Sequence, residues 1–237
     1  MNCLKIGVFA YNFPHKKTQE GLLHLFLQGY RIECVLAADP VQLRFYQSKL
    51  RIAPRGVSYT HPRVVAERIG ADYHVVAHDS AEAHDLIRSH DLDLGVILGA
   101  RILKKPTIDA FNVGVLNLHP GLLPENRGLD NIKWAILKMW PQGVTGHLID
   151  EKIDCGSLID RREVDVFDDD TLLDVFLRVQ NTELLVLDRC LEVLNGGTRD
   201  FSPLGESNYF KAVPAKEEAL LMETFDRYKQ SYSTLSL

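Results

Sequence analysis

Short apolar runs alternate with amphipathic segments through the first half of the chain, and this alternation constrains the fold more than any other feature. The runs are typical of strands and the segments between them have helical spacing, so the chain is expected to form βαβ units. Continuous apolar runs suit a parallel sheet covered by helices on both faces, which predicts a doubly wound, mostly parallel α/β sheet with ligands at the carboxyl ends of its strands. The expected strands cover residues 4–10, 32–37, 73–77 and 92–98, and the expected helices lie around 22–27, 62–69 and 81–89.

The second half of the chain follows a different pattern. A strand is expected at 115–119, a helix near 130–139, two β-like runs at 144–149 and 157–166, a long helix over 171–194 and a final charged helix over 215–228. The acidic residues 165–170 are expected to cap the long helix with carboxylates. The tail after this helix is too short for an independent domain. We therefore expect one domain over residues 1–195 and a C-terminal loop and helix extension over residues 196–237.

Composition excludes several classes of function. Of the 237 residues, 46% are hydrophobic and 25% charged, which is typical of a globular protein, and the net charge of −5 supplies no basic field for nucleic acid. The four cysteines form no CxxC pair and the histidine spacing shows no zinc-ligand cluster, so no metal is expected. The sequence shows neither a signal peptide nor a stretch of roughly 20 apolar residues, so we expect a cytoplasmic protein without a membrane partner.

The segment richest in chemistry follows the run at 115–119. Asn117 and His119 are two residues apart on a strand, so they project from the same face at its end. An amide and an imidazole there can stabilise an oxyanion and handle a proton, although they can equally satisfy loop carbonyls. Downstream, either Asp150 or Asp154 is able to orient the imidazole, and composition does not choose between them.

Together these segments resemble the family of formyltransferases that use 10-formyltetrahydrofolate. The resemblance covers about residues 90–165, and it implies a Rossmann-like fold and transfer of a formyl group to an amine. It rests on Asn117-x-His119-Pro120-x-Leu122-Leu123-Pro124, on Arg127-Gly128, on Gly143-Val144-Thr145 with His147, on Asp154 seven residues later, and on the upstream segment Gly99-Ala100-Arg101-Ile102-Leu103.

The resemblance also implies roles for single residues. The catalytic trio of the family falls on Asn117, His119 and Asp154, and no metal is required. The pterin of the folate is expected to bind at two loops, and the role of His147 stays open. The expected folate-binding residues are Arg101, Ile102, Leu103, Asp150 and Ile153.

The acceptor amine is predicted from the positions at which this chain differs from particular groups of family members. Purine-pathway members carry a Gly-Ser-Asn turn after the first strand, whereas this chain has Ala10-Tyr11-Asn12, and the basic β-domain of the members that formylate initiator tRNA is not expected here. The loop Asn126-Arg127-Gly128 is most similar to that of the nucleotide-linked sugar N-formyltransferases, which implies a role in lipopolysaccharide biosynthesis. The expected substrate-binding residues are Tyr11, Asn12, Lys16, Asn126, Arg127, Tyr209 and Phe210.

Other interpretations stay open from sequence. Formylation of glycinamide ribonucleotide is one alternative, and a catalytically silent protein that binds folate or nucleotide is another. The segment from Arg44 to Arg63 has basic residues interleaved with Phe45, Tyr46 and Tyr59, so it is a candidate for gripping a diphosphate and stacking a base, or a solvated loop. No pattern decides between a monomer and a homodimer.

Overall fold

The centre of the molecule is a seven-stranded sheet. The computed structural model describes residues 4–41 and 48–233. The strands of this sheet are β1 (Ile6–Tyr11), β2 (Ile32–Ala38), β3 (Asp72–Val75), β4 (Leu94–Ile97), β5 (Gly114–His119), β7 (Gln142–Leu148) and β8 (Ser157–Val164). The helices are α1 (Lys16–Leu27), α2 (Pro62–Ile69), α3 (Ala81–Ser89), α4 (Lys105–Ile108), α5 (Asn131–Lys138), α6 (Leu172–Asn195), α7 (Ala215–Glu218) and α8 (Leu221–Tyr232).

The order of the strands confirms the predicted fold class. The sheet runs β3-β2-β1-β4-β5-β7-β8. The first five strands are parallel, and β7 and β8 continue the sheet in antiparallel pairing. The parallel part has its carboxyl ends at one edge, where β5 ends at His119.

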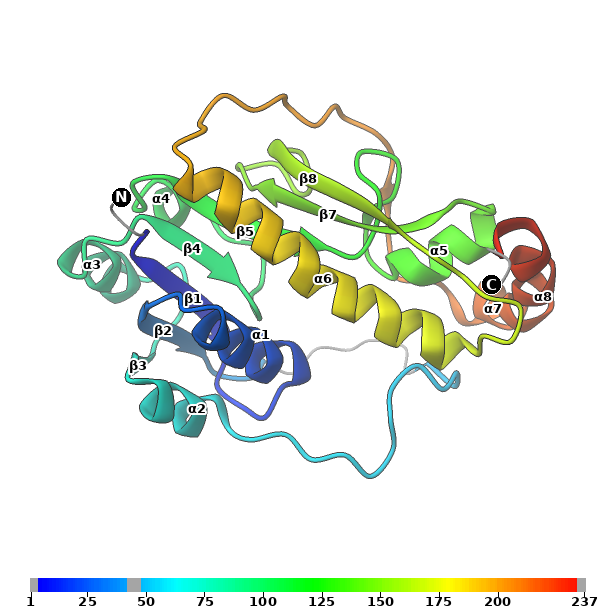
Figure 1. Cartoon of the computed structure of the whole chain (residues 1–237), viewed down its shortest axis with the longest axis horizontal. Helices are drawn as coiled ribbons and strands as arrows, with labels where there is room; N and C mark the ends of the chain where they lie inside the picture. Colours follow the sequence, from blue (N-terminus) through cyan, green and yellow to red (C-terminus); the bar gives the residue numbers. More distant parts are fainter. Residues whose placement is uncertain (1–3, 42–47, 234–237) are drawn as a thin grey trace.

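Helices cover both faces of the parallel strands (Figure 1). The buried side chains of α1, α2 and α6 form one core with Val8 and Val96, while those of α3 and α4 form a second core with Phe9 and Val115. Neighbouring residues of one strand thus point into opposite layers, which explains why these strands are apolar without alternation. Among the described residues, no helix is long and apolar enough to cross a membrane.

Local signals located most elements well. Helix α2 begins with Pro62 after the capping residue His61, and α3 begins after the capping residue Ser80, as predicted. The prediction that acidic residues cap the long helix was wrong. Thr171 caps α6 in a capping box with Asp174, while the Asp170 carboxylate pairs with Arg178.

The tail returns to the rest of the molecule. It leaves α6, runs beside the start of β8 through an isolated bridge between Ser157 and Pro203, and ends in α7 and α8 near α5 (Figure 1). The prediction of one continuous helix over 215–228 was wrong, because the chain turns between α7 and α8. No proline or glycine marks that turn. The division into residues 1–195 and 196–237 stays a prediction.

A short two-stranded sheet joins the tail to the candidate site. Strand β9 (Tyr209–Phe210) pairs in parallel with β6 (Arg127–Gly128). Gly128 has a φ of +110°, and a Cβ built there would lie 2.0 Å from the carbonyl oxygen of Phe210. Only glycine allows this close approach of the two backbones.

Candidate active site

Strand β5 carries the polar pair predicted from the sequence. Asn117 and His119 share one face of β5, and the antiparallel register places His147 of β7 opposite Asn117. The amide nitrogen Nδ2 of Asn117 lies 3.2 Å from Nε2 of His147, which is fully buried. His147 therefore orients the amide of Asn117, a role that depends on strand pairing and that local sequence patterns do not reveal.

The loop after β7 brings a carboxylate to His119. Strand β7 ends opposite Leu116, yet Oδ1 of Asp154 lies 3.4 Å from Nδ1 of His119, so the loop folds back along β5. The backbone N–H of Gly128 donates to Oδ2 of Asp154 at 3.0 Å, and Asp154 itself adopts a left-handed φ of +52°. Asp150 accepts a bond from the backbone of Lys152 instead. The geometry thus selects Asp154 as the partner of His119.

The second ring nitrogen of His119 also faces an acceptor. Nε2 lies 2.8 Å from the backbone oxygen of Asn126, which also accepts a hydrogen bond from the amide of Asn131 at 2.7 Å. Both ring nitrogens of His119 therefore face oxygen atoms, and these two contacts fix the orientation of the ring beside Asn117.

The pKa values of Asp154 and His147 are both lowered, but for different reasons. Burial alone would raise the pKa of Asp154, but its hydrogen bond and charge interaction with His119, followed by His147 and the Gly128 N–H, lower it overall. Burial, with the nearby charge of His119, lowers the pKa of His147 from 6.5 to about 4. A neutral His147 beside a negatively charged Asp154 is the arrangement expected at neutral pH.

The pKa of His147 leads to a prediction about stability. The folded pKa lies below the unfolded value, so His147 favours the folded state above pH 6.5, and this contribution is lost as the pH falls from about 6.5 to about 4. The shift corresponds to about 3 kcal/mol. The free energy of unfolding, measured with urea at several pH values, should fall between pH 6.5 and pH 4. This fall should be about 3 kcal/mol smaller in His147→Asn than in the wild type. Parallel pH curves for the two proteins would contradict the assignment.

Thr145 and Arg161 hold the loop that leaves β5. The hydroxyl of Thr145 donates to the carbonyl of Gly121 at 2.7 Å and accepts from the N–H of Leu123 at 3.0 Å. Arg161 donates to the carbonyl of Leu123 at 2.9 Å. These contacts fix the path of the loop that brings the carbonyl of Asn126 to His119.

The predicted folate-binding residues lie on two loops. Ile102 is 64% exposed and Ile153 is 37% exposed, whereas Leu103 is buried in the core. A cavity of about 780 Å³ is lined in part by Arg101, Ile102 and Leu103, and the stacked rings of Tyr11 and Phe13 border it. Its volume is in the range of small-molecule sites. Pterin binding by these residues and by Asp150 stays a prediction.

A smaller cavity lies beside the start of α1. It has a volume of about 360 Å³ and is bordered by Leu118 and Pro120, the two neighbours of His119. Lys17 lines this cavity. Its ammonium group donates to the carbonyl of Leu118 at 3.0 Å and to the buried carboxylate of Glu183 at 2.8 Å. Lys16 pairs with Glu20. Asn117, His119 and Asp154 line neither of these two cavities.

The residues predicted to bind the acceptor have different surroundings. The guanidinium of Arg127 donates to the carbonyls of Ile153 and Ser207, so it joins the loop after β7 to the tail, and its contact with the acceptor stays a prediction. The side chain of Asn126 is buried and donates to the carbonyl of Asn131. Phe210 packs between Trp134 and Trp140 and anchors the tail, whereas Tyr209 is 42% exposed.

Tyr11, the last residue of β1, and Asn12, which follows it, both form hydrogen bonds within the protein. The hydroxyl of Tyr11 donates to the carbonyl of Ala100, and the amide of Asn12 bonds to Asp39 and to the hydroxyl of Tyr73. Substrate contacts by Tyr11, Asn12 and Lys16 therefore stay predictions.

The candidate diphosphate segment is described only in part. Arg44, Phe45 and Tyr46 lie outside the described residues. In the remainder, the Arg63 guanidinium lies 4.6 Å from the ring centre of Tyr73, and the backbone N–H of Lys49 donates to Glu218. Diphosphate binding by this segment stays a prediction.

Comparison with known proteins agrees with this geometry. A family model described as "Formyl transferase" matches residues 40–191. The chain is 33% identical over 98 residues to a GDP-perosamine N-formyltransferase of Brucella melitensis, covering 41% of this chain and 38% of that protein. It is 32% identical over 142 residues to a methionyl-tRNA formyltransferase of Chlorobium limicola, covering 59% and 44%. The matches thus span about two-fifths of the length of these curated relatives.

Solved structures share the fold. A phosphoribosylglycinamide formyltransferase of Anaplasma phagocytophilum has a TM-score of 0.65 at 20% identity, covering 89% of this chain and 99% of that chain. A sugar N-formyltransferase of a Shewanella species has a TM-score of 0.62 at 20% identity, covering 94% and 88%. At this level of identity the likeness establishes the fold alone.

Proposed function

Because the chain belongs to the formyl transferase family, we propose that it moves a formyl group from 10-formyltetrahydrofolate to the primary amine of a nucleotide-linked amino sugar. The observation that carries this proposal is the group of polar side chains at the carboxyl end of β5. His119 meets Asp154 there, and His147 orients the amide of Asn117 on the same face. Such a set of donors and acceptors is what acyl transfer to an amine requires.

The folate donor fits the loops beside the larger cavity. Exposed apolar side chains at Ile102 and Ile153 offer contact area for the faces of a flat ring, and backbone amide groups are able to match its polar rim. 10-Formyltetrahydrofolate supplies a formyl group that is activated by its bond to nitrogen. The expected roles of Arg101, Leu103 and Asp150 are to shape and border this site.

The chemistry follows from the charges of the site. When the amine nitrogen bonds to the formyl carbon, negative charge grows on the formyl oxygen. The amide of Asn117, which keeps one N–H not directed to His147, and the neighbouring ring of His119 stabilise that charge, since both are held in place before the reaction. Asp154 keeps His119 oriented, and the carboxylate of Asp154 can take a proton from the amine and return it, directly or through water, to the departing nitrogen.

The smaller cavity lies on the α1 side of β5, where Leu118 lines it, whereas the side chains of Asn117 and His119 project from the opposite face of the strand. The two lysines at the start of α1 already have carboxylate partners, Glu20 for Lys16 and Glu183 for Lys17. A phosphate monoester would have to compete with these carboxylates. A diphosphate would compete with them in the same way, so the lysines do not separate the two acceptors. The GDP-perosamine N-formyltransferase among the relatives is what supports a nucleotide-linked amino sugar.

A panel of acceptors tests the proposal. The protein is incubated with 10-formyltetrahydrofolate and GDP-, UDP- or dTDP-linked amino sugars, with glycinamide ribonucleotide, or with methionyl-tRNA, and products are weighed by mass spectrometry. We expect a nucleotide-linked amino sugar to gain one carbonyl group. Its N-acetylated form, which lacks the primary amine, is the matched control and should gain nothing. Formylation of glycinamide ribonucleotide or methionyl-tRNA alone would refute the acceptor, and consumption of no donor would favour the silent binder.

A further inference from the structure

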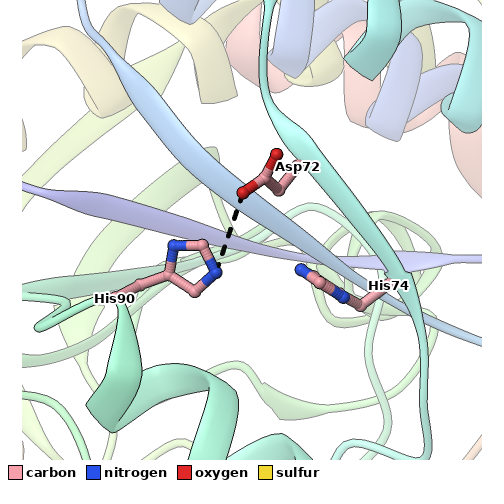
Figure 2. A group of neighbouring side chains, drawn as sticks. All are labelled: Asp72, His74 and His90. Carbon is pink, nitrogen blue, oxygen red and sulfur yellow. Dashed lines mark ion pairs between the residues drawn. The ribbon is translucent and has the colours of Figure 1, made fainter.

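Three potential metal ligands meet at the edge of the sheet away from the candidate active site. Asp72 and His74 belong to β3, the first strand in the order of the sheet, and they share one face because they are two residues apart. His90 directly follows α3. Figure 2 shows the His90 ring directed across to Asp72 and His74. The sequence did not suggest this cluster, because the two histidines are far apart in the chain and only the packing of α3 beside β3 brings them together.

The contacts within this cluster leave donor atoms available. One ligand atom from each residue lies within 4.8 Å of the others. Nε2 of His90 lies 3.9 Å from Oδ2 of Asp72, which is longer than a hydrogen bond. Nε2 of His74 is buried and has no hydrogen-bond partner within residues 4–41 and 48–233. A buried nitrogen without a hydrogen-bond partner destabilises the folded protein, so this arrangement favours an additional ligand.

We propose that Asp72, His74 and His90 bind a divalent transition-metal ion of the zinc type. Two imidazoles and one carboxylate are ligands that Zn²⁺ accepts, whereas Mg²⁺ and Ca²⁺ prefer oxygen ligands alone. Two donors at 2.0–2.1 Å from a tetrahedral zinc lie about 3.3 Å apart. The ligand atoms therefore need to approach one another by about 1.5 Å at most, which rotation of the exposed Asp72 side chain and a small adjustment of the two half-buried histidines allow.

The surroundings of the cluster suit such an ion. The side chain of Asp72 is 69% exposed and that of His90 21%, so the ion can enter from solvent and keep a water as its fourth ligand. An ion held there links β3 to the end of α3 and stabilises the folded edge of the sheet. Strands β2, β1 and β4 separate β3 from β5, so the site is distinct from the one that carries His119.

Calorimetric titration with ZnCl₂ tests the site independently of any enzymatic activity. After treatment with a chelator, the whole protein should bind one equivalent of Zn²⁺. His74→Gln and His90→Gln should each weaken binding by at least about tenfold, the lower end of what the loss of an outer-shell partner costs. His24→Gln is the matched control, because His24 also faces a carboxylate, that of Asp188, but has no second imidazole beside it in the described part of the chain. It should bind Zn²⁺ as the wild type does.

Thermal unfolding provides a second measurement that is independent of the calorimetric titration. A saturating excess of Zn²⁺ should raise the melting temperature of the wild type and of His24→Gln, but not of a protein with both His74→Gln and His90→Gln. Each variant is compared with its own metal-free form, so a loss of stability from the substitution itself does not obscure the result. Absence of Zn²⁺ binding by the wild type, or equal binding by the double variant, would overturn the proposal.

Discussion

His119→Ala is expected to reduce the turnover number for formyl transfer by about a hundredfold or more, because removal of one charge-stabilising group from an oxyanion site costs that much. The ring of His119 contacts both the carboxylate of Asp154 and the carbonyl of Asn126, so its loss removes the imidazole beside Asn117 and one contact of each acceptor. Asn117→Ala and Asp154→Ala are expected to have effects of similar size. Steady-state rates with saturating donor and acceptor measure the change.

The double variant His119→Ala/Asp154→Ala makes this prediction sharper. Groups that act as a unit are strongly non-additive, so the double variant should be little slower than either single variant. His24→Ala, which removes an imidazole paired with Asp188 on α6, serves as a control and should keep the wild-type rate. Thermal unfolding of each variant shows whether it is folded. Folded His119→Ala that retains wild-type turnover would contradict the proposed role.

Glu218→Ala is expected to lower the free energy of unfolding by about 3–5 kcal/mol, the usual cost of breaking a buried ion pair. Lys133 of α5 and Glu218 of α7 are 2.9 Å apart, and both side chains are only 4% exposed. Without Glu218, the buried ammonium keeps only Asp130, at 3.4 Å. Glu218 also accepts bonds from the hydroxyl of Ser48 and the backbone of Lys49, which would be lost as well.

Urea unfolding of a small set of variants isolates this pair. Replacing both partners, as in Lys133→Met/Glu218→Leu, should recover most of the lost stability, because no charge is then buried alone. Glu192→Ala breaks an exposed pair with Arg189 and should change stability little. A Glu218→Ala protein as stable as the wild type would show that the tail is not held to α5 by this pair.

Much of the fold was predictable because its signals are local. Helix-like spacing between the apolar runs located α2 and α3, and the continuous apolar runs located the parallel strands. Where the signal was not local, prediction failed. The turn between α7 and α8 has no proline or glycine, and the cap of α6 is Thr171 although several acidic residues precede it.

The sequence predicted the parts of the site that lie within one segment of the chain, but not the contacts between segments. The two-residue spacing of Asn117 and His119 placed them on one face, but the choice of Asp154 over Asp150 required the loop that folds back along β5. The contact of His147 with Asn117 depends on the register of β5 and β7, and the cluster of Asp72, His74 and His90 on the packing of α3. These are contacts between distant parts of the chain, which periodicity does not encode.

The most direct measurement follows the formyl carbon itself. The donor is prepared with carbon-13 in its formyl group, and the acceptor and the solution are examined by carbon NMR after reaction with a nucleotide-linked amino sugar. We expect the label to appear in an amide on the sugar nitrogen, with tetrahydrofolate formed in equal amount, and to disappear from that product in folded His119→Ala. Label that appears only as free formate, or an unchanged yield from His119→Ala, would contradict transfer at this site.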